Sequence, residues 1–203
     1  MKIAGEYTFD APRAEVWAGL LDPEVLAKTM PGCEKLELVG DNEYEGVLNI
    51  KVGPVQGKFQ GKVKLEEIRE PEGYTMKVDG RGAPGFVKAA APIELIDQGD
   101  KTLLKYDSDA QVGGRVASVG QRLLDSSAKA IIKQSLEGLN ETLKARTTAA
   151  EKGDEPPAPA EAPSQAEFAA NVAKEVAKDL VPKPVLMVAG IVILLIVLWL
   201  LFG

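Results

Sequence analysis

The sequence predicts an α+β fold in which a curved antiparallel sheet wraps around one long helix. Residues 3–9 alternate between apolar and polar side chains, as expected of a half-buried strand. Further alternating segments follow between residues 34 and 113, and turn residues separate them. From Arg115 to Arg146 the apolar period lengthens to that of a helix. When the sheet of this meander bends around the long helix, the apolar faces of both elements are buried.

The N-terminal part is predicted to contain one strand and two short helices. The strand IAGEYTF places four residues on one face: Ile3, Gly5, Tyr7 and Phe9. Asp10 ends this strand and is predicted to cap a helix in the segment APRAEVWAGLLD. A second short helix, PEVLAKTM, is predicted to stop at Pro31 and Gly32.

The meander is predicted from six segments and the turns between them. The segments are CEKLELVG, EYEGVLNIKVG, VQGKFQGKVKLEEIRE, GYTMKVDGRG, FVKAAAPIELID and KTLLKYDSDAQVG. Turn signals at GDN, GP, EPEG, GAPG and DQGDK have the spacing of an antiparallel sheet. The long helix that follows has a broad apolar face, formed by Val116, Val119, Leu123, Leu124, Ile131, Ile132, Leu136, Leu139 and Leu143.

Glycines recur on the apolar faces of the predicted strands. The segment VQGKFQGKVKL turns Val55, Gly57, Phe59, Gly61, Val63 and Leu65 to one side. The same mixture occurs in the segments 44–50 and 74–82. Glycine inside a strand weakens the sheet, so these glycines indicate either sharp curvature or space kept for a ligand. Both explanations stay open from the sequence.

A ligand cavity on this face would have an almost wholly apolar lining and would take an apolar ligand. The predicted lining residues are Met30, Tyr44, Leu48, Phe59, Tyr74, Met76, Phe86, Leu104, Tyr106, Leu123 and Ile131. The hydroxyl groups of Tyr7, Tyr44, Tyr74 or Tyr106 could contact a carbonyl of the ligand. Each tyrosine could equally be a core aromatic with its hydroxyl at the rim.

Composition argues against several classes of site. The net charge of −6 predicts no nucleic-acid partner. The chain has no histidine and one cysteine, Cys33, which excludes disulfides within the chain, Cys-His zinc sites and nucleophiles activated by histidine. The acidic pairs Glu66–Glu67 and Asp107–Asp109 lie next to turns or on outward faces. We therefore predict no catalytic residue, no metal and no cofactor, and not an enzyme.

The chain divides after a globular domain at residues 1–148. The segment 149–165 is rich in Pro, Ala and Glu and is predicted to be a flexible linker. Residues 166–181 follow, in which Phe168, Val172, Val176 and Leu180 recur every four residues. This spacing predicts an amphipathic helix next to a membrane.

Residues 183–203 are predicted to be a C-terminal transmembrane anchor. No charged side chain occurs from Val185 to Phe202, and a helix of this length spans about 27 Å, close to the ~30 Å hydrocarbon core. Lys174, Lys178 and Lys183 all precede the span. The positive-inside rule then leaves the globular domain on the cytoplasmic side of the cell membrane.

The order of these elements resembles the START-like, or SRPBCC, helix-grip superfamily. Three runs look like the G-subunit family of carbon monoxide dehydrogenase: FDAPRAEVWAGLLDPEVLAKTMPGCEKLE, YEGVLNIKVGPVQGKFQGKV and TLLKYDSDAQVGGRVASVGQRLL. The similarity covers residues 2–145. It implies a helix-grip fold whose cavity mouth lies near Val25, Leu26, Met30, Pro84 and Phe86.

The resemblance also implies a partner and a role. The partner is the molybdenum-containing carbon monoxide dehydrogenase, which the protein would recruit to the membrane. Electrons from carbon monoxide must reach respiratory quinone, so a quinone such as menaquinone is the expected ligand. Two alternatives remain: a membrane anchor for the enzyme with no ligand, and a small-molecule enzyme of the helix-grip class.

Overall fold

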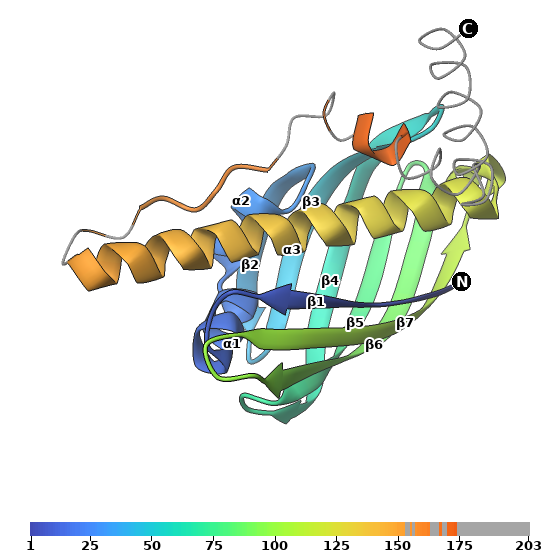
Figure 1. Ribbon diagram of the computed structural model, residues 1–203. Helices are drawn as coiled ribbons and strands as arrows, with labels where there is room; N and C mark the ends of the chain where they lie inside the picture. Colours follow the sequence, from blue (N-terminus) through green and yellow to red (C-terminus); the bar gives the residue numbers. More distant parts are fainter. Residues whose placement is uncertain (153–154, 156, 163–166, 168–169, 174–203) are drawn as a thin grey trace, which may run out of the picture.

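The computed structural model describes residues 1–152, 155, 157–162, 167 and 170–173. Its main element is a seven-stranded sheet in the order β1-β7-β6-β5-β4-β3-β2, in which every neighbouring pair is antiparallel. The long helix α3 crosses the concave face of this sheet (Figure 1). The predicted α+β architecture is therefore confirmed.

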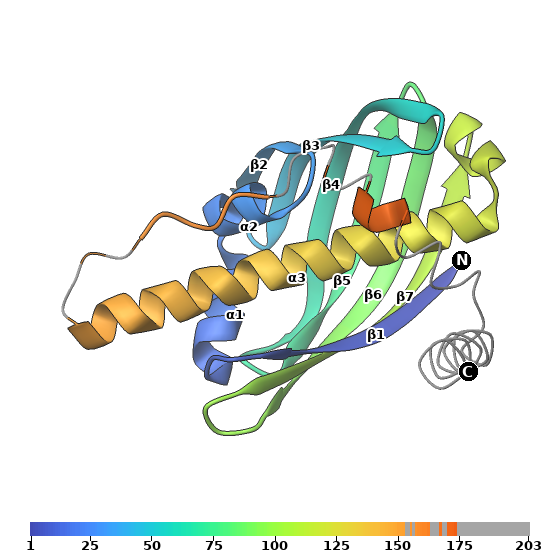
Figure 2. The ribbon, with the colours of Figure 1, turned by 45° about the horizontal axis from the view of Figure 1, so that its top comes forward.

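The strands follow the predicted segments closely. They are β1 (Lys2–Phe9), β2 (Cys33–Gly40), β3 (Glu43–Val52), β4 (Val55–Arg69), β5 (Gly73–Gly82), β6 (Gly85–Asp97) and β7 (Thr102–Gly113). The six later strands form one meander of hairpins. The last of them, β7, pairs with the first strand of the chain, β1. The sheet curves around α3 in both ribbon views (Figures 1 and 2).

The two short helices, α1 (Arg13–Leu21) and α2 (Pro23–Thr29), lie within the predicted segments, but the start of α1 differs from the prediction. The expected cap at Asp10 is wrong, because Pro12 precedes α1 and no side chain caps it. Asp10 instead accepts a hydrogen bond from Lys101 Nζ at 2.8 Å. Asp22 caps α2, since its Oδ1 accepts from the backbone N–H of Glu24 and of Val25 at 3.0 and 3.2 Å.

The C-terminal helical region is two elements where one was predicted. A short 3₁₀ helix, η1 (Arg115–Val119), comes first, and α3 runs over Gln121–Lys152. Gly120 separates them with a φ of 94°, a conformation that glycine adopts without steric cost. Because α3 continues to Lys152, it also passes the predicted domain end at residue 148.

The main core lies where α1, α2 and the C-terminal half of α3 meet the sheet. Its fully buried side chains include Phe9, Val16, Val25, Leu95 and Leu139. Burial of each such side chain stabilises the fold by roughly 1.5–3 kcal/mol. Trp17 and Tyr74 meet edge to face within this core, with ring centroids 5.7 Å apart.

The tail was predicted to leave the domain, but part of it lies against the domain. Residues 157–162 run back beside α3 (Figure 1), where the N–H of Ala160 donates to Thr142 Oγ1 at 3.0 Å. The predicted amphipathic helix at 166–181 is described only at 167 and 170–173, and the predicted span at 183–203 lies outside the described residues. Within the described part of the chain, no helix has both the length and the apolarity needed to cross a bilayer.

Candidate ligand-binding site

The inner face of the sheet carries large side chains at the end covered by α1. Cross-strand register aligns these residues in rows, because side chains directly opposite each other share a face. Two adjacent rows are Tyr7, Leu104 and Leu95, and then Gly5, Tyr106, Ile93 and Tyr74. Leu95, Leu104 and Tyr74 are buried in the main core. This end of the concave surface is therefore filled by protein.

Further along the strands the same face becomes small. Gly46, Gly61 and Gly80 stand directly opposite one another on β3, β4 and β5, and we call them the glycine row. A Cβ atom at Gly61 would meet no heavy atom within 4 Å, and one at Gly80 would meet only the carbonyl oxygen of Val87 at 3.8 Å. Open space therefore lies in front of the sheet at these two positions.

Other positions of the sheet require glycine because neighbouring atoms leave no room for a side chain. A Cβ atom at Gly82 would collide with the backbone of Lys58 on β4, and one at Gly57 would lie 2.5 Å from Pro84 Cγ. At Gly46 the neighbours are Lys35 O at 2.9 Å and Leu36 Cδ1 at 3.1 Å. Close approach of neighbouring atoms explains these three glycines, whereas it does not explain Gly61 and Gly80.

Most of the predicted lining residues lie on the inner side. Tyr44, Phe59, Tyr74 and Leu104 are buried, and Met76 and Tyr106 pack against the main core. Leu48 stands opposite Phe59, and Met30 follows the last turn of α2. Leu123 and Ile131 belong to a second, smaller cluster on α3, together with Ala130 and Val172. The predicted set thus divides between a packed core and a second cluster on α3.

Phe86 was predicted to line the cavity, and this prediction is wrong. Its side chain is 40% exposed and lies on the outer face, where its ring covers Gly113 of β7. Phe86 and Lys88 are two residues apart on β6, and residues two apart on a strand share a face. Lys88 lies on the outer face, so Phe86 lies there too. The predicted mouth is wrong in two further positions, since Val25 and Pro84 are fully buried.

The tyrosines of the inner face are neutral and largely committed to the fold. Tyr44 donates from its hydroxyl to the carbonyl oxygen of Leu21 at 3.1 Å. The hydroxyl of Tyr106 lies over Gly5, where no side chain occupies the space. Burial raises the pKa of Tyr44, Tyr74 and Tyr106 above the ordinary tyrosine value.

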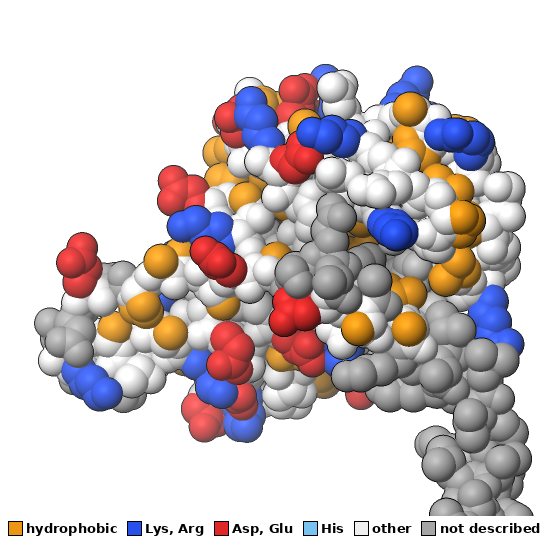
Figure 3. Space-filling model, turned by 90° about the horizontal axis from the view of Figure 1, so that it is seen from above, with side chains coloured by type: hydrophobic (Ala, Val, Ile, Leu, Met, Phe, Trp, Pro, Cys, Tyr) orange, Lys and Arg blue, Asp and Glu red, His pale blue; other side chains and the backbone are white. Residues whose placement is uncertain are grey.

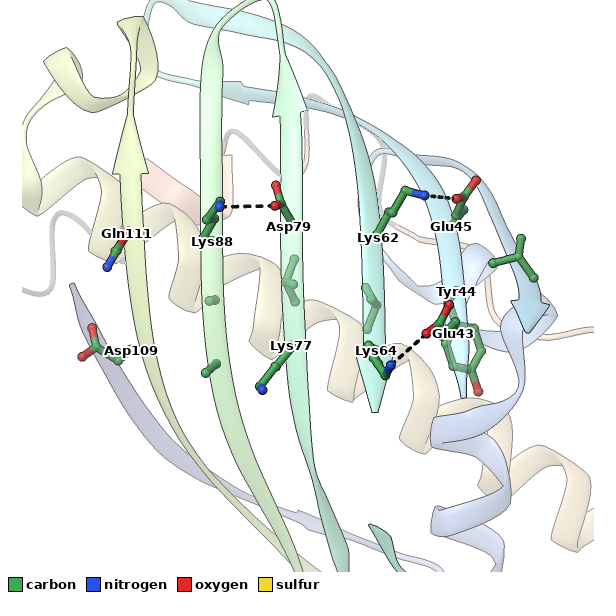
Figure 4. Close-up of a pocket in the computed structure, with 15 residues that line it drawn as sticks. Glu43, Tyr44, Glu45, Lys62, Lys64, Lys77, Asp79, Lys88, Asp109 and Gln111 are labelled. Carbon is green, nitrogen blue, oxygen red and sulfur yellow. Dashed lines mark ion pairs between the residues drawn. The ribbon is translucent and has the colours of Figure 1, made fainter. Parts of the chain in front are cut away.

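The outer face of the sheet holds a hollow of about 620 Å³ that differs in chemistry (Figure 4). Ion pairs line it, with Lys62–Glu45 at 2.7 Å, Lys64–Glu43 at 3.0 Å and Lys88–Asp79 at 3.5 Å. Each pair joins residues directly opposite on neighbouring strands. These groups are solvent-exposed, so they define strand register more than stability and do not suit an apolar ligand.

Comparisons with known proteins place the chain in a family. The family model for the G subunit of carbon monoxide dehydrogenase (CoxG) matches residues 5–144. The chain belongs to the CoxG family. A search of curated proteins found no match to this CoxG-family chain.

Solved structures agree with this assignment at the level of the fold. A conserved protein from Geobacillus kaustophilus is 35% identical and has a TM-score of 0.68, with 71% of this chain and 95% of that chain covered. The Zhui aromatase/cyclase from a Streptomyces species is 15% identical, with a TM-score of 0.56 and coverages of 74% and 97%. A START superfamily protein from Mycobacterium smegmatis is 15% identical, with a TM-score of 0.53 and coverages of 70% and 98%. The fold of this CoxG-family chain is thus START-like.

Three polar residues of α3 were not predicted from the sequence. Ser126, Ser127 and Gln134 are at most 5% exposed, and among the described residues their side-chain polar atoms have no hydrogen-bond partner. Buried polar groups are normally paired, so an unpaired set needs an explanation. The signal in the sequence was the spacing of Ser127 and Gln134, two turns apart among apolar residues.

In the same described part of the chain, no cluster of His, Cys, Asp or Glu is placed to hold a metal ion.

Proposed function

We propose that this CoxG-family protein holds a lipophilic ligand, a respiratory quinone such as menaquinone, in front of the glycine row. The observation that carries the proposal is the alignment of Gly46, Gly61 and Gly80 in one row, with open space at Gly61. Apolar surface removed from water contributes roughly 25 cal/mol per Å². A bound isoprenoid chain would gain this energy against half-buried Val63, which flanks Gly61 on β4, and half-buried Val78, which stands opposite Val63 on β5.

The partner follows from the family. As a CoxG-family member, the protein is an accessory protein of carbon monoxide dehydrogenase. The finer proposal is that it recruits a molybdenum-containing form of this enzyme and delivers quinone to it as electron acceptor. Oxidation of carbon monoxide releases electrons, and a quinone that stays in the bilayer cannot reach a soluble enzyme. A protein that carries quinone within its own fold would remove this barrier.

Membrane attachment is part of the proposal. Residues 183–203 would form a single-pass anchor, and the support is the absence of charged side chains from Val185 to Phe202. The lysines that precede this segment favour a globular domain on the cytoplasmic side. An anchored domain meets its ligand at the membrane, where quinone is concentrated.

We also infer that the protein is not itself an enzyme. Histidine, the commonest general base, is absent from the sequence. The ion-paired carboxylates Glu43, Glu45 and Asp79 lie on the outer face, away from the space at the glycine row. A carrier or docking role needs none of these groups.

The ligand proposal is tested by extraction of the purified protein. The full chain is produced in a host that makes menaquinone, purified in detergent and extracted with solvent, and the extract is analysed by mass spectrometry. Menaquinone at about one molecule per chain is expected. A stoichiometric fatty acid or polyprenyl lipid would support a carrier of another lipid, and an empty protein that still binds carbon monoxide dehydrogenase would establish a ligand-free anchor.

The anchor proposal is tested by deletion of residues 185–203. The shortened chain is expected to bind carbon monoxide dehydrogenase but to lose coupling to membrane quinone, measured as carbon monoxide-dependent reduction of menaquinone in vesicles. A matched control replaces residues 185–203 with an unrelated apolar span of equal length and should restore coupling. Unchanged coupling in the deletion would refute the membrane-loading step.

A further inference from the structure

The described tail residues touch the domain at three places. The N–H of Ala160 donates to Thr142 on α3, and the N–H of Ala162 donates to the carbonyl oxygen of Lys28 on α2 at 2.6 Å. Further along, Val172 is only 9% exposed and packs against Ala130 of α3. In both ribbon views the short helical piece that contains residues 170–173 lies beside α3 (Figures 1 and 2).

The surface of α3 under Val172 combines apolar and polar residues. Leu123, Ser127, Ala130 and Gln134 follow one another at spacings of four, three and four, so they share one helical face. We call them the Ser127–Gln134 face. Leu123 reaches the β3–β4 turn, because a Cβ atom at Gly53 would lie 2.6 Å from Leu123 Cδ2. The face therefore borders the rim of the sheet at the β3–β4 turn.

The polar groups of this face have no partner in the described part of the chain. Ser127 is 2% exposed and Gln134 is 5% exposed, and neither the hydroxyl nor the amide forms a hydrogen bond there. Burial of unpaired hydrogen-bonding groups costs free energy that a suitable ligand atom would recover. The glutamine amide and the serine hydroxyl can both donate to a carbonyl oxygen.

We propose that the Ser127–Gln134 face binds the carbonyl-bearing ring of the lipophilic ligand, and that Val172 covers this face when the ligand is absent. This inference rests on the proposed carrier function. The apolar members, Leu123 and Ala130, contact the ring, and Gln134 and Ser127 donate to its oxygen. The tail and the ring compete for one surface, so departure of Val172 from Ala130 accompanies loading.

The upper side of the molecule suits such an exchange. Figure 3 shows that hydrophobic side chains on this side form several separate groups between charged ones. Lys and Arg among these charged residues can reach the lipid headgroup region, while apolar residues between them tolerate an isoprenoid chain.

The polar contact is tested in the full chain, in detergent, by titration with two probes. One probe is a short-chain menaquinone, and the other is squalene, an isoprenoid hydrocarbon without oxygen. Gln134→Leu is expected to weaken menaquinone binding about tenfold or more and to leave squalene binding unchanged. Gln121→Leu, an exposed glutamine on the same helix, is the matched control. Ser127→Ala is a milder second variant, expected to weaken only menaquinone binding.

The outcomes separate this inference from the carrier proposal. A wild-type chain that binds neither probe refutes the carrier function itself. A wild-type chain that binds menaquinone, with both variants equally tight, overturns only the assignment of Ser127 and Gln134. Melting temperatures of the variants identify a folding defect, and the squalene titration shows whether a folded variant keeps its apolar site.

The covering role of Val172 has its own test. Val172→Asp should raise the rate at which the full chain takes menaquinone from vesicles several-fold, because a charged side chain no longer packs on Ala130. Ala173→Asp adds the same charge at an exposed neighbouring position and serves as the control. Equal uptake rates for wild type and Val172→Asp would overturn the covering role.

Discussion

The two ends of the concave face are built from the same strands but serve different purposes. At the α1 end, Phe9, Leu95 and Leu104 are buried against Leu139 of α3 in one cluster. At the other end, the glycine row presents no side chains, and space remains in front of Gly61. One sheet therefore supplies both a packed core and an unfilled surface.

The difference shows how a small domain can separate close packing from a glycine-lined surface along the same strands. Stability comes from the close-packed end, where each deleted methylene is felt. The glycine end contributes less, because a glycine inside a strand is destabilising by roughly 0.5–1 kcal/mol relative to alanine. Stability and room for a ligand are separated along the strands, so changes at one end should leave the other largely intact.

The largest expected effect is a loss of stability at the packed end, compared with the loss at the other end of the same helix. Leu139→Ala should lower the free energy of unfolding by about 2–5 kcal/mol, because Leu139 is fully buried and the change leaves a cavity. Leu123→Ala, at the half-buried end of α3, should cost well under half as much. Urea denaturation of both full-length variants measures the difference, and equal losses would refute the division between the two ends.

A smaller effect is expected from glycine substitutions. Gly5→Ala should destabilise by about 1–3 kcal/mol, because the new methyl group meets the hydroxyl of Tyr106. Gly61→Ala should instead stabilise by roughly 0.5–1 kcal/mol, since its methyl group enters open space. Thermal denaturation followed by circular dichroism distinguishes the two. Loss of stability in Gly61→Ala would mean that side chains already fill the space.

The smallest effect concerns the outer face and depends on pH. The hydrogen bond from Lys62 holds the pKa of Glu45 below its ordinary value and raises the pKa of Lys62. The stabilisation linked to Glu45 is therefore present above the ordinary carboxyl pKa and is lost as the pH falls through its native value. That linked to Lys62 is present below the ordinary lysine pKa and is lost as the pH rises through its native value.

The measurement for this pair is a melting temperature as a function of pH. The melting temperature of wild type should exceed that of Lys62→Met by a small amount. This difference should be largest near neutral pH and should shrink at both acidic and alkaline extremes. Lys51→Met, an exposed lysine on β3, is the control. A difference independent of pH would show that Lys62 acts through packing of its stem and not through its charge.

The fold could be predicted from the sequence because each element has a local signal. The alternation in β4 and the turns at Gly53–Pro54 and Gly99–Asp100 fix strand boundaries without knowledge of any partner. The break at Gly120 was missed because Val116 and Val119 fit the helical period of the residues that follow. A single positive φ outweighs that period, and periodicity does not report it.

The site could be predicted only in part. The glycines of the inner face were visible from alternation, but their alignment depends on the register between strands, which no single strand encodes. Phe86 was assigned to the wrong face, although its alternation with Lys88 indicates the outer one. Ser127 and Gln134 were overlooked because their burial depends on tertiary contacts. The contacts of Ala160 and Ala162 use backbone N–H groups, and the composition of a Pro- and Ala-rich segment carries no signal for them.

The central claim, that the glycine row keeps space for a lipophilic ligand, is tested most directly at Gly61. The full chain with Gly61→Val, produced in a menaquinone-making host, is compared with wild type and with Gln60→Val, which places the same side chain on the outer face. Bound menaquinone per chain is measured by extraction and mass spectrometry. We predict that Gly61→Val loses most of its bound menaquinone and keeps its stability, while Gln60→Val matches wild type. Full occupancy in a folded Gly61→Val chain would contradict the claim.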